Sequence, residues 1–312
     1  MGEFDLIRRF FQRPAGDGVE VGIGDDCAVL SATPGARWLV SSDMLVEGRH
    51  FLSTVAPERL GHKALAVNLS DLAACGATPR GFTLALALPR VDEGWLAGFA
   101  RGLLALADAS DCPLVGGDTT QGPLNLCVTV FGEAPAGQAL LRSGARAGDE
   151  IWVSGQLGDA RLALEVFRGH LALDGAGFEA ARRAMECPAP RLALGRALRG
   201  VATAAIDLSD GLLGDLGHIL AASGVGARLD ADALPRSALL AAQPLALQRQ
   251  CGLAGGDDYE LVFTAPPGAA LPDVGVALTR IGTVEAAPGL RVVDARGAAL
   301  EHGLAAFDHF KS

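Results

Sequence analysis

Apolar and polar positions in the first half of the chain alternate between the period of a strand and the period of a helix. The predicted strands of this half are 37–45, 81–89, 112–118 and 124–134, and its predicted helices are 4–12, 57–75 and 92–110. The pattern is clearest in 92–110, whose apolar positions are Trp95, Phe99, Leu103 and Leu106. A spacing of three or four residues places these side chains on one helix face. Strands that alternate with helices predict a mixed sheet with helices packed against it.

The second half begins with a new strand, predicted over 147–155. Beyond it, helices are predicted at 159–168, 176–186, 190–199 and 210–222, and strands at 225–230, 259–264 and 278–284. The linker is predicted within 135–146, because Pro135, Gly137 and Gly144 interrupt any regular period. We therefore predict an α/β (α+β) chain of two domains, 1–137 and 138–312.

Length and charge narrow the class of protein. A chain of 312 residues agrees with two domains. Its formal net charge of −10, with Lys63 and Lys311 as the only lysines, is expected to repel nucleic acid and anionic membranes. No apolar run approaches the ~18 residues that span a bilayer, and the first residues lack the apolar region of a signal peptide. Six cysteines without C-x-x-C spacing favour free thiols in a reducing cytoplasm.

The candidate chemistry lies in aspartates that stand among apolar residues and glycines. They are Asp25, Asp26, Asp43, Asp71, Asp118, Asp207, Asp210, Asp257 and Asp258. A carboxylate buried in such a setting must be paired or must bind a metal. Sites rich in Asp, Ser and Thr oxygen suit Mg²⁺, which keeps waters and takes one or two carboxylates together with substrate phosphates. Nearby glycines, such as Gly116 and Gly117, let the backbone approach a ligand closely.

Each of these motifs alone is more often a turn or a helix cap, and Ser209 next to Asp210 is a case in point. Asp71 is harder to explain in that way. It stands within an apolar helical pattern three residues after Asn68, so the two side chains share a helix face. Taken together, the aspartates predict a site for Mg²⁺ and ATP.

Several familiar nucleotide motifs are missing from the sequence. There is no G-x-x-x-x-G-K-[ST], which excludes a P-loop. There is no H-R-D or D-F-G pair, which excludes a protein-kinase fold. His62, His170, His218 and His302 are interpreted as surface or helix-face residues, whereas His50 is a candidate substrate contact. The chain is therefore predicted to be a soluble enzyme that binds Mg²⁺ and ATP through dispersed aspartates.

The motifs in their order resemble one known family. They are "GIGDDCAVL", "SSDMLVEGRHF", "HKALAVNLSDLAACGATP", "LVGGDTT", "LLRSGARAGDEIWVSG", "AIDLSDGLLGDLGHI" and "GGDDYEL". This set is similar to the thiamine-monophosphate kinase family, from near residue 4 to the final "FDHF". That family belongs to the ATP-binding superfamily of aminoimidazole-ribonucleotide-synthetase-like proteins. The resemblance implies ATP-dependent phosphorylation of thiamine monophosphate to thiamine diphosphate, the last step of its biosynthesis, in the bacterial cytoplasm.

The resemblance also implies a role for each part. Domain 1–137 would bind ATP and Mg²⁺ and form a homodimer through its sheet, and 138–312 would be a second α/β domain. Several Mg²⁺ ions would be held by Asp26, Ser41, Ser42, Asp43, Asp71, Asp118, Asp207 and Asp210. The co-substrate ATP would contact Gly117, Asp118, Arg142 and Ser209. Thiamine monophosphate would contact His50, Asp257 and Phe307. The family often has Thr at Ser42, Glu at Asp257 and another aromatic residue at Phe307.

No catalytic general base is expected. The acceptor is a phosphate monoester whose second pKa is near 6, so it is largely dianionic at neutral pH. Direct in-line transfer without a phosphoenzyme follows from this. Two rivals stay open. One is another ATP-using synthetase of the superfamily, acting on a formylglycinamidine ribonucleotide or selenide. The other is a non-catalytic structural module that binds divalent metal.

Overall fold

The computed structural model describes residues 2–14 and 16–300. The chain forms two compact units. The first runs to Gly137 without the short segment Ala73–Gly76. The second comprises Ala73–Gly76 and the chain from Gln138 onward.

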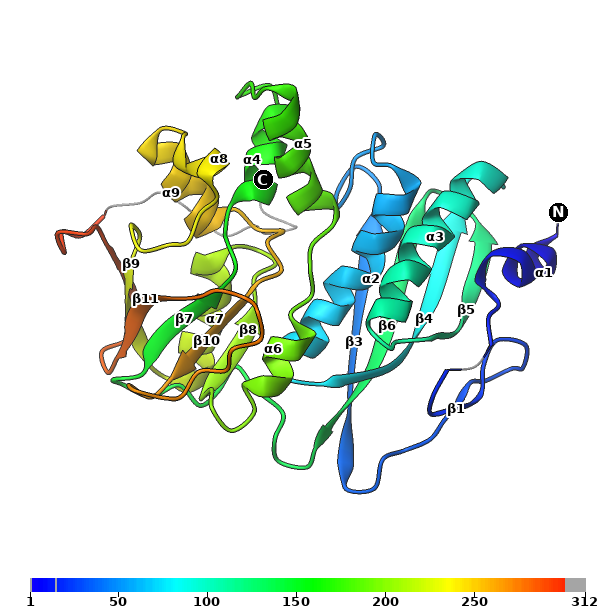
Figure 1. Cartoon of the computed structure of the whole chain (residues 1–312), viewed down its shortest axis with the longest axis horizontal. Helices are drawn as coiled ribbons and strands as arrows, with labels where there is room; N and C mark the ends of the chain where they lie inside the picture. The colour runs from blue at the N-terminus through cyan, green and yellow to red at the C-terminus, as the bar shows by residue number, and fades with distance from the viewer. Residues whose placement is uncertain (1, 15, 301–312) are drawn as a thin grey trace. The chain divides into compact units, whose positions relative to one another are not determined.

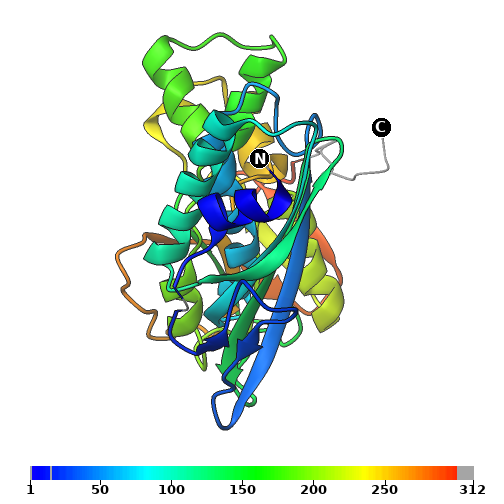
Figure 2. The ribbon, with the colours of Figure 1, turned by 90° about the vertical axis from the view of Figure 1, so that its right-hand side faces the viewer.

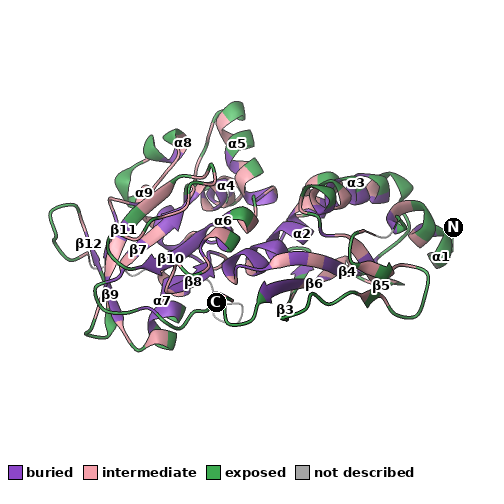
Figure 3. Cartoon of the chain, turned by 60° about the horizontal axis from the view of Figure 1, so that its bottom comes forward, coloured by how far each residue is buried: buried purple, intermediate pink, exposed green. Residues whose placement is uncertain are grey.

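The first unit is built on a four-stranded sheet in the order β3-β6-β4-β5. The strands are β3 (Ala36–Val46), β6 (Asn125–Pro135), β4 (Thr78–Leu88) and β5 (Leu114–Gln121). Only the β4–β5 pair is parallel, so the sheet is mixed. Helices α2 (Pro57–Ala74) and α3 (Glu93–Ala109) cover one of its faces (Figures 1 and 3). The N-terminal segment, α1 (Glu3–Leu6) and η1 (Ile7–Phe11), lies at the β5 side of the sheet (Figure 2), and β1 (Val19–Val21) pairs with β2 (Val29–Leu30).

Helices α2 and α3 approach each other through glycines. A Cβ atom at Gly102 would lie 1.8 Å from the Glu58 carbonyl oxygen, and one at Gly61 would lie 2.1 Å from the Phe99 carbonyl oxygen. Real Cβ atoms do not come this close to backbone, so only glycine permits this separation of the helices. The same packing buries Phe99 completely.

We expect Gly102→Ala to lower the free energy of unfolding by about 1–2 kcal/mol, because the added methyl group forces the two helix backbones apart. The matched control is Gly94→Ala in the same helix, where the nearest contact of a Cβ atom is Asp92 Oδ1 at an ordinary 3.5 Å. That control is expected to leave stability unchanged or to raise it by up to about 1 kcal/mol. Chemical denaturation measures both variants, and equal effects would contradict the packing argument.

The second unit is built on a six-stranded sheet in the order β12-β9-β11-β7-β10-β8. Its strands are β12 (Gly289–Val293), β9 (Gly226–Asp230), β11 (Leu278–Glu285), β7 (Glu150–Ser154), β10 (Leu261–Ala265) and β8 (Ala204–Asp207). Only β12 and β9 are parallel. Alternate residues of β10 enter two cores, because Val262 packs with α7 (Leu212–Ser223) whereas Leu261 and Phe263 pack with α6 (Leu192–Ala197). The remaining helices are α4 (Asp159–Phe167), α5 (Gly175–Glu186), α8 (Ala238–Ala241) and α9 (Leu245–Ala254).

The predicted fold class is confirmed, since both units are mixed α/β sheets flanked by helices. Three details differ from the sequence prediction. The predicted helix 4–12 is divided into α1 and the wider π-helical turn η1. Strands β1, β2, β8 and β12 and helix α8 were not predicted, because they are too short to show a period, and the ten-residue helix α9 was not predicted either. The predicted strand 112–118 begins two residues later, as the edge strand β5, in which only Val115 is buried. Among the described residues, no helix has the length and apolar character needed to cross a membrane.

Candidate functional site

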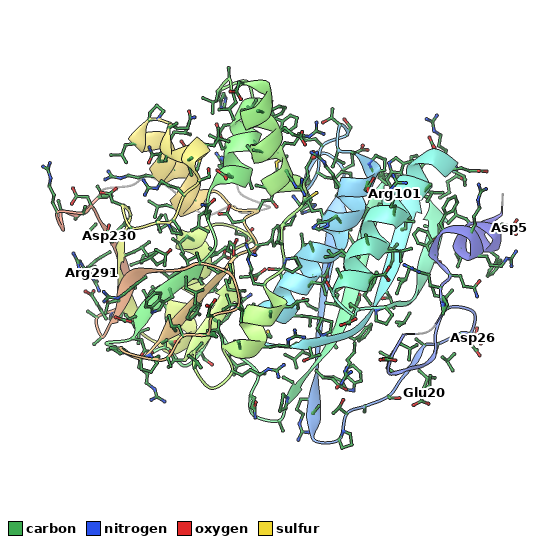
Figure 4. All side chains as sticks on the ribbon, in the orientation of Figure 1. Asp5, Glu20, Asp26, Arg101, Asp230 and Arg291 are labelled. Atoms are coloured by element: carbon green, nitrogen blue, oxygen red, sulfur yellow. The ribbon has the colours of Figure 1, made fainter. Side chains whose placement is uncertain are left out.

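The first unit contains a pocket of about 600 Å³. Its walls come from the N-terminal helical segment, the loop 23–28 and strand β5. The polar residues of the loop and strand are Asp25, Asp26, Gly116, Gly117, Asp118 and Thr119. Figure 4 labels Asp26 on this loop, on the same side of the unit as Asp5 of α1. The pocket thus brings together three predicted site residues, Asp26, Gly117 and Asp118.

Gly117 has a structural reason to be glycine. Its φ of 145° is one that other residues rarely adopt. A Cβ atom at this position would lie 1.9 Å from the carbonyl oxygen of Leu84 in the neighbouring strand. Close pairing with the neighbouring strand therefore requires glycine here. Gly116 and Gly117 both line the pocket without a side chain, which suits the close approach of a phosphate group to their backbone.

A second group of predicted residues lies between α2 and β3. The Ser41 hydroxyl donates a hydrogen bond of 2.5 Å to Asp71 Oδ2. The backbone N–H of Asp43 donates to Asn68 Oδ1 at 3.0 Å. Asn68 and Asp71 therefore face the same strand, which confirms that they share a face of α2. The position of Asp71 in an apolar helix is explained by its polar partner on the sheet.

Ser42 lies on the opposite face of the sheet from its two neighbours. Side chains alternate along a strand, and the Ser42 hydroxyl contacts Thr129 Oγ1 at 2.9 Å on that other face. The structure thus groups Ser41 with Asp71 and separates the Ser42 hydroxyl from them. The predicted contact of Ser42 with metal is therefore not supported by the position of its side chain.

His50 follows β3 in a turn that it helps to close. Its Nδ1 accepts a hydrogen bond of 3.0 Å from the backbone N–H of Val46. An accepting nitrogen carries no proton, so the contact leaves Nε2 as the donor of the ring.

The second unit brings two predicted loops together. The N–H of Asp257 donates to the Ser209 carbonyl oxygen, and the N–H of Tyr259 donates to that of Leu208, both at 2.8 Å. Asp257 and Tyr259 have φ values of 61° and 50°, in the left-handed region. Positive φ in residues other than glycine often marks a functional loop. The result places Asp257 beside the turn that carries Asp207, Ser209 and Asp210.

The turn after β8 is held by a carboxyl group that sequence reasoning missed. Asp215 Oδ2 accepts hydrogen bonds of 3.1 Å from the N–H groups of Asp210 and Gly211. Burial, followed by the charge of Asp210, raises the pKa of Asp215 to about 7. Its signal in the sequence is the acidic residue five positions after Asp210, one helical turn into α7.

A buried ion pair was missed as well. Glu260 accepts hydrogen bonds from Ser154 Oγ at 2.5 Å and from Arg191 Nε at 2.6 Å, and Arg191 Nη2 also donates to it. The bonds to Glu260 raise the pKa of Arg191. The three residues are far apart in sequence, so no local pattern could pair them. Glu260 directly follows the loop of Asp257 and anchors its end.

Two predicted residues do not join these groups. The carbonyl oxygen of Arg142 accepts from Ser223 Oγ at 3.2 Å, at the C-terminal end of α7. Ser209 precedes the N-terminal end of the same 12-residue helix, about 18 Å away along its axis. Within the second unit, Arg142 and Ser209 therefore lie at opposite ends of α7 and are not neighbours. Phe307 lies outside the described residues.

The expectation that the aspartates are buried is wrong for three of the nine. Asp25, Asp26 and Asp118 are exposed, and only Asp207, at 5% exposure, is fully buried among the predicted metal ligands. These three residues lie in a loop and in the edge strand β5, where apolar neighbours in the sequence do not lead to burial. Within residues 2–14 and 16–300, no group of three or more His, Cys, Asp or Glu side chains is arranged to hold a metal ion.

Comparison with known proteins gives a consistent result. Residues 24–134 match the N-terminal domain of AIR synthase related proteins, and residues 146–295 match their C-terminal domain. The chain is 48% identical over 297 residues to the thiamine-monophosphate kinase of Salmonella typhimurium, covering 91% of each. It is 45% identical to the thiamine-monophosphate kinase of Stenotrophomonas maltophilia, with a TM-score of 0.85 over 91% of this chain and 93% of that one. It is 30% identical to AaThiL complexed with AMPPCP and TMP, with a TM-score of 0.79 over 89% of each chain.

Proposed function

The chain belongs to the thiamine-monophosphate kinase family, and from this we propose that it transfers the γ-phosphoryl group of ATP to thiamine monophosphate. The products are thiamine diphosphate and ADP. The observation that carries the proposal is the conjunction, in one pocket, of the bare backbone at Gly117 with the carboxylates of Asp26 and Asp118. The identity of 48% over 91% of the Salmonella enzyme supports the same reaction.

Magnesium is part of the proposal, and the donors fit it. The Asp26, Asp71 and Asp118 carboxylates and the Ser41 hydroxyl are all oxygen donors, which is what Mg²⁺ prefers. One or two carboxylates per ion are enough, because substrate phosphates and water complete the coordination. When bound, Mg²⁺ would supply positive charge that offsets the charge of two phosphate groups.

The residues of the chain would orient the metal ligands and bind the nucleotide phosphates. Ser41 orients Asp71 by its 2.5 Å hydrogen bond. The backbone around Gly117 is open to the phosphates of the nucleotide. Since the acceptor phosphate is already largely ionised, direct in-line transfer needs no general base from the protein. The proposed set of metal ligands also includes Asp43, Asp207 and Asp210. The proposed contacts to ATP also include Arg142 and Ser209. The proposed contacts to thiamine monophosphate are made by His50 and Asp257.

The proposal is tested by measuring ADP release with thiamine monophosphate and, separately, with free thiamine. In the presence of ATP, we expect ADP release with thiamine monophosphate but not with free thiamine, and we expect thiamine diphosphate as the product. A formylglycinamidine ribonucleotide or selenide offered with ATP should give no ADP. Absence of ADP with every acceptor, together with stabilisation by divalent metal alone, would favour the structural module. A trapped aspartyl phosphate would contradict direct transfer.

A homodimer formed through the sheet of the first unit belongs to the same proposal. Alternate residues of β3 expose large apolar side chains on the face away from α2 and α3, and Val40 and Met44 are 60% and 56% exposed. Such a surface typically marks an interface. Light scattering should give the mass of two chains, and Val40→Glu should give the mass of one. A cytoplasmic location is proposed because the reaction consumes ATP.

A further inference from the structure

A glycine-rich loop, residues 155–158, joins strand β7 to helix α4 in the second unit. A strand, a glycine-rich loop and the N-terminal end of a helix form an arrangement that often binds phosphate. Here the N–H of Gly155 donates to the Ala277 carbonyl oxygen at 2.9 Å. The N–H of Leu157 donates to the Pro235 carbonyl oxygen at 3.0 Å. Two backbone donors of this loop are thus used by the protein itself.

A third donor of the loop is taken by a carboxyl group of the chain. The N–H of Gly158, the N-cap of α4, donates to Asp258 Oδ1 at 2.9 Å. Gly158 has a φ of 93°, and a Cβ atom there would lie 2.9 Å from the backbone carbonyl carbon of Cys251 in α9. Only glycine fits this close approach. Asp258 therefore takes the place at the end of α4 that an external anion takes in phosphate-binding proteins.

Asp258 directly follows Asp257, the proposed contact to thiamine monophosphate. Asp257 has a φ of 61°, a conformation that persists only where the surrounding structure holds it. Glu260, two residues beyond Asp258, packs against the same glycine-rich loop, because a Cβ atom at Gly155 would lie 1.9 Å from Glu260 Oε1. Asp258 and Glu260 thus fasten the segment that follows Asp257 to the two ends of loop 155–158.

The surroundings of the Asp258 carboxyl group disfavour its charged form. Burial raises the pKa of Asp258 well above the usual range, whereas the hydrogen bond from Gly158 lowers it. The nearby charges of Glu260, Asp257 and Asp159 raise this pKa further. A carboxyl group that resists ionisation contributes an acceptor oxygen to its partner more than it contributes charge. The amide of asparagine offers the same acceptor oxygen.

We propose that Asp258 is a positioning residue for the acceptor, because its hydrogen bond to loop 155–158 holds the neighbouring Asp257 in place to bind thiamine monophosphate. This inference rests on the proposed function, since it explains how a proposed contact to the acceptor is aimed. Asp258 itself touches neither substrate and takes no part in the transfer of the phosphoryl group.

The test compares Asp258→Ala with Asp258→Asn in the full-length enzyme. For Asp258→Ala we expect the KM for thiamine monophosphate to rise about tenfold, because a binding group misplaced by about 1 Å has effects of this order or larger. The value of kcat and the KM for ATP should stay within about twofold of wild type. Asp258→Asn keeps the acceptor oxygen, so its KM for thiamine monophosphate should lie within about threefold of wild type.

The matched control is Asp174→Ala in the same unit. Asp174 is the N-cap of α5, and its Oδ1 accepts a hydrogen bond of 2.6 Å from the Gly177 N–H. It follows the C-terminal end of α4, and the nine residues of that helix place this end about 13 Å from Gly158. Asp174→Ala should lower the melting temperature and leave each KM unchanged. If Asp258→Ala likewise changed only the melting temperature, the inference would be overturned.

A double mutant shows whether Asp258 acts through Asp257. In an Asp257→Ala background, Asp258→Ala should raise the KM for thiamine monophosphate no further, because the residue that it positions is gone. Additive effects would overturn the inference, as would an Asp258→Asn variant as impaired as Asp258→Ala. A wild-type enzyme that forms no ADP would instead contradict the proposed function.

Amide hydrogen exchange of loop 155–158 in the substrate-free protein tests the hydrogen bond independently of any reaction. Exchange should be faster in Asp258→Ala than in Asp258→Asn, because only the asparagine still accepts from the Gly158 N–H. Equal exchange in the two variants would overturn the inference.

Discussion

Asp71→Asn is expected to lower kcat/KM by two to three powers of ten while the fold stays intact. Loss of one carboxylate ligand removes a negative charge that would hold Mg²⁺ against the phosphates, and metal-assisted charge stabilisation is worth several kcal/mol. The amide of asparagine still accepts the hydrogen bond that Ser41 donates at 2.5 Å, so the contact between α2 and β3 survives. Steady-state kinetics at saturating Mg²⁺ measures the effect.

The matched control is Asp92→Asn in the same unit. Asp92 is the N-cap of α3 and accepts a hydrogen bond of 3.0 Å from the Trp95 N–H. Asparagine caps helices about as well as aspartate, so this variant loses the same charge without loss of structure. Its activity should match wild type. Normal turnover of Asp71→Asn, with an unchanged melting temperature, would remove Asp71 from the metal site.

Glu260→Gln is expected to lower the free energy of unfolding of the second unit by about 3 kcal/mol. The Glu260 side chain is 8% exposed, and its two carboxylate oxygens accept from Arg191 and Ser154. Glutamine replaces one acceptor by an amide that donates, which leaves the Arg191 guanidinium short of a partner. Breaking a buried ion pair typically costs about 3–5 kcal/mol, and the 26% exposure of Arg191 places this case at the lower end.

Denaturant unfolding followed by circular dichroism checks this prediction, and Glu58→Gln serves as the control. Glu58 pairs with Arg101 at 2.9 Å, but both side chains are more than half exposed. Solvent screens such a pair, so the control should show no measurable change in stability. If the two variants destabilised the protein equally, the buried ion pair of Glu260 would contribute no more to stability than an exposed one. Glu260→Gln should also raise the KM for thiamine monophosphate, because Glu260 anchors the end of the Asp257 loop.

The aspartate motifs predicted the site unevenly. Asp71 and Asn68 could be placed on one helix face because helical spacing is local, and the structure confirms that both face β3. The burial assigned to Asp26 and Asp118 was wrong, because apolar sequence neighbours do not reveal whether a loop or edge strand is covered. Ser41 and Ser42 seemed equivalent in sequence, yet the pleat of β3 turns their hydroxyls to opposite faces.

The sequence by itself determined the order of the elements, the mixed α/β class and the family, because periodicity and motif order are properties of neighbouring residues. Only the tertiary structure decided which residues meet. The contact of Asp257 with Ser209, the ion pair of Glu260 with Arg191, and the pocket that joins the N-terminal segment to Gly117 all link positions far apart in the chain. Such contacts are set by strand register and by helix packing across the sheets, which no local pattern encodes.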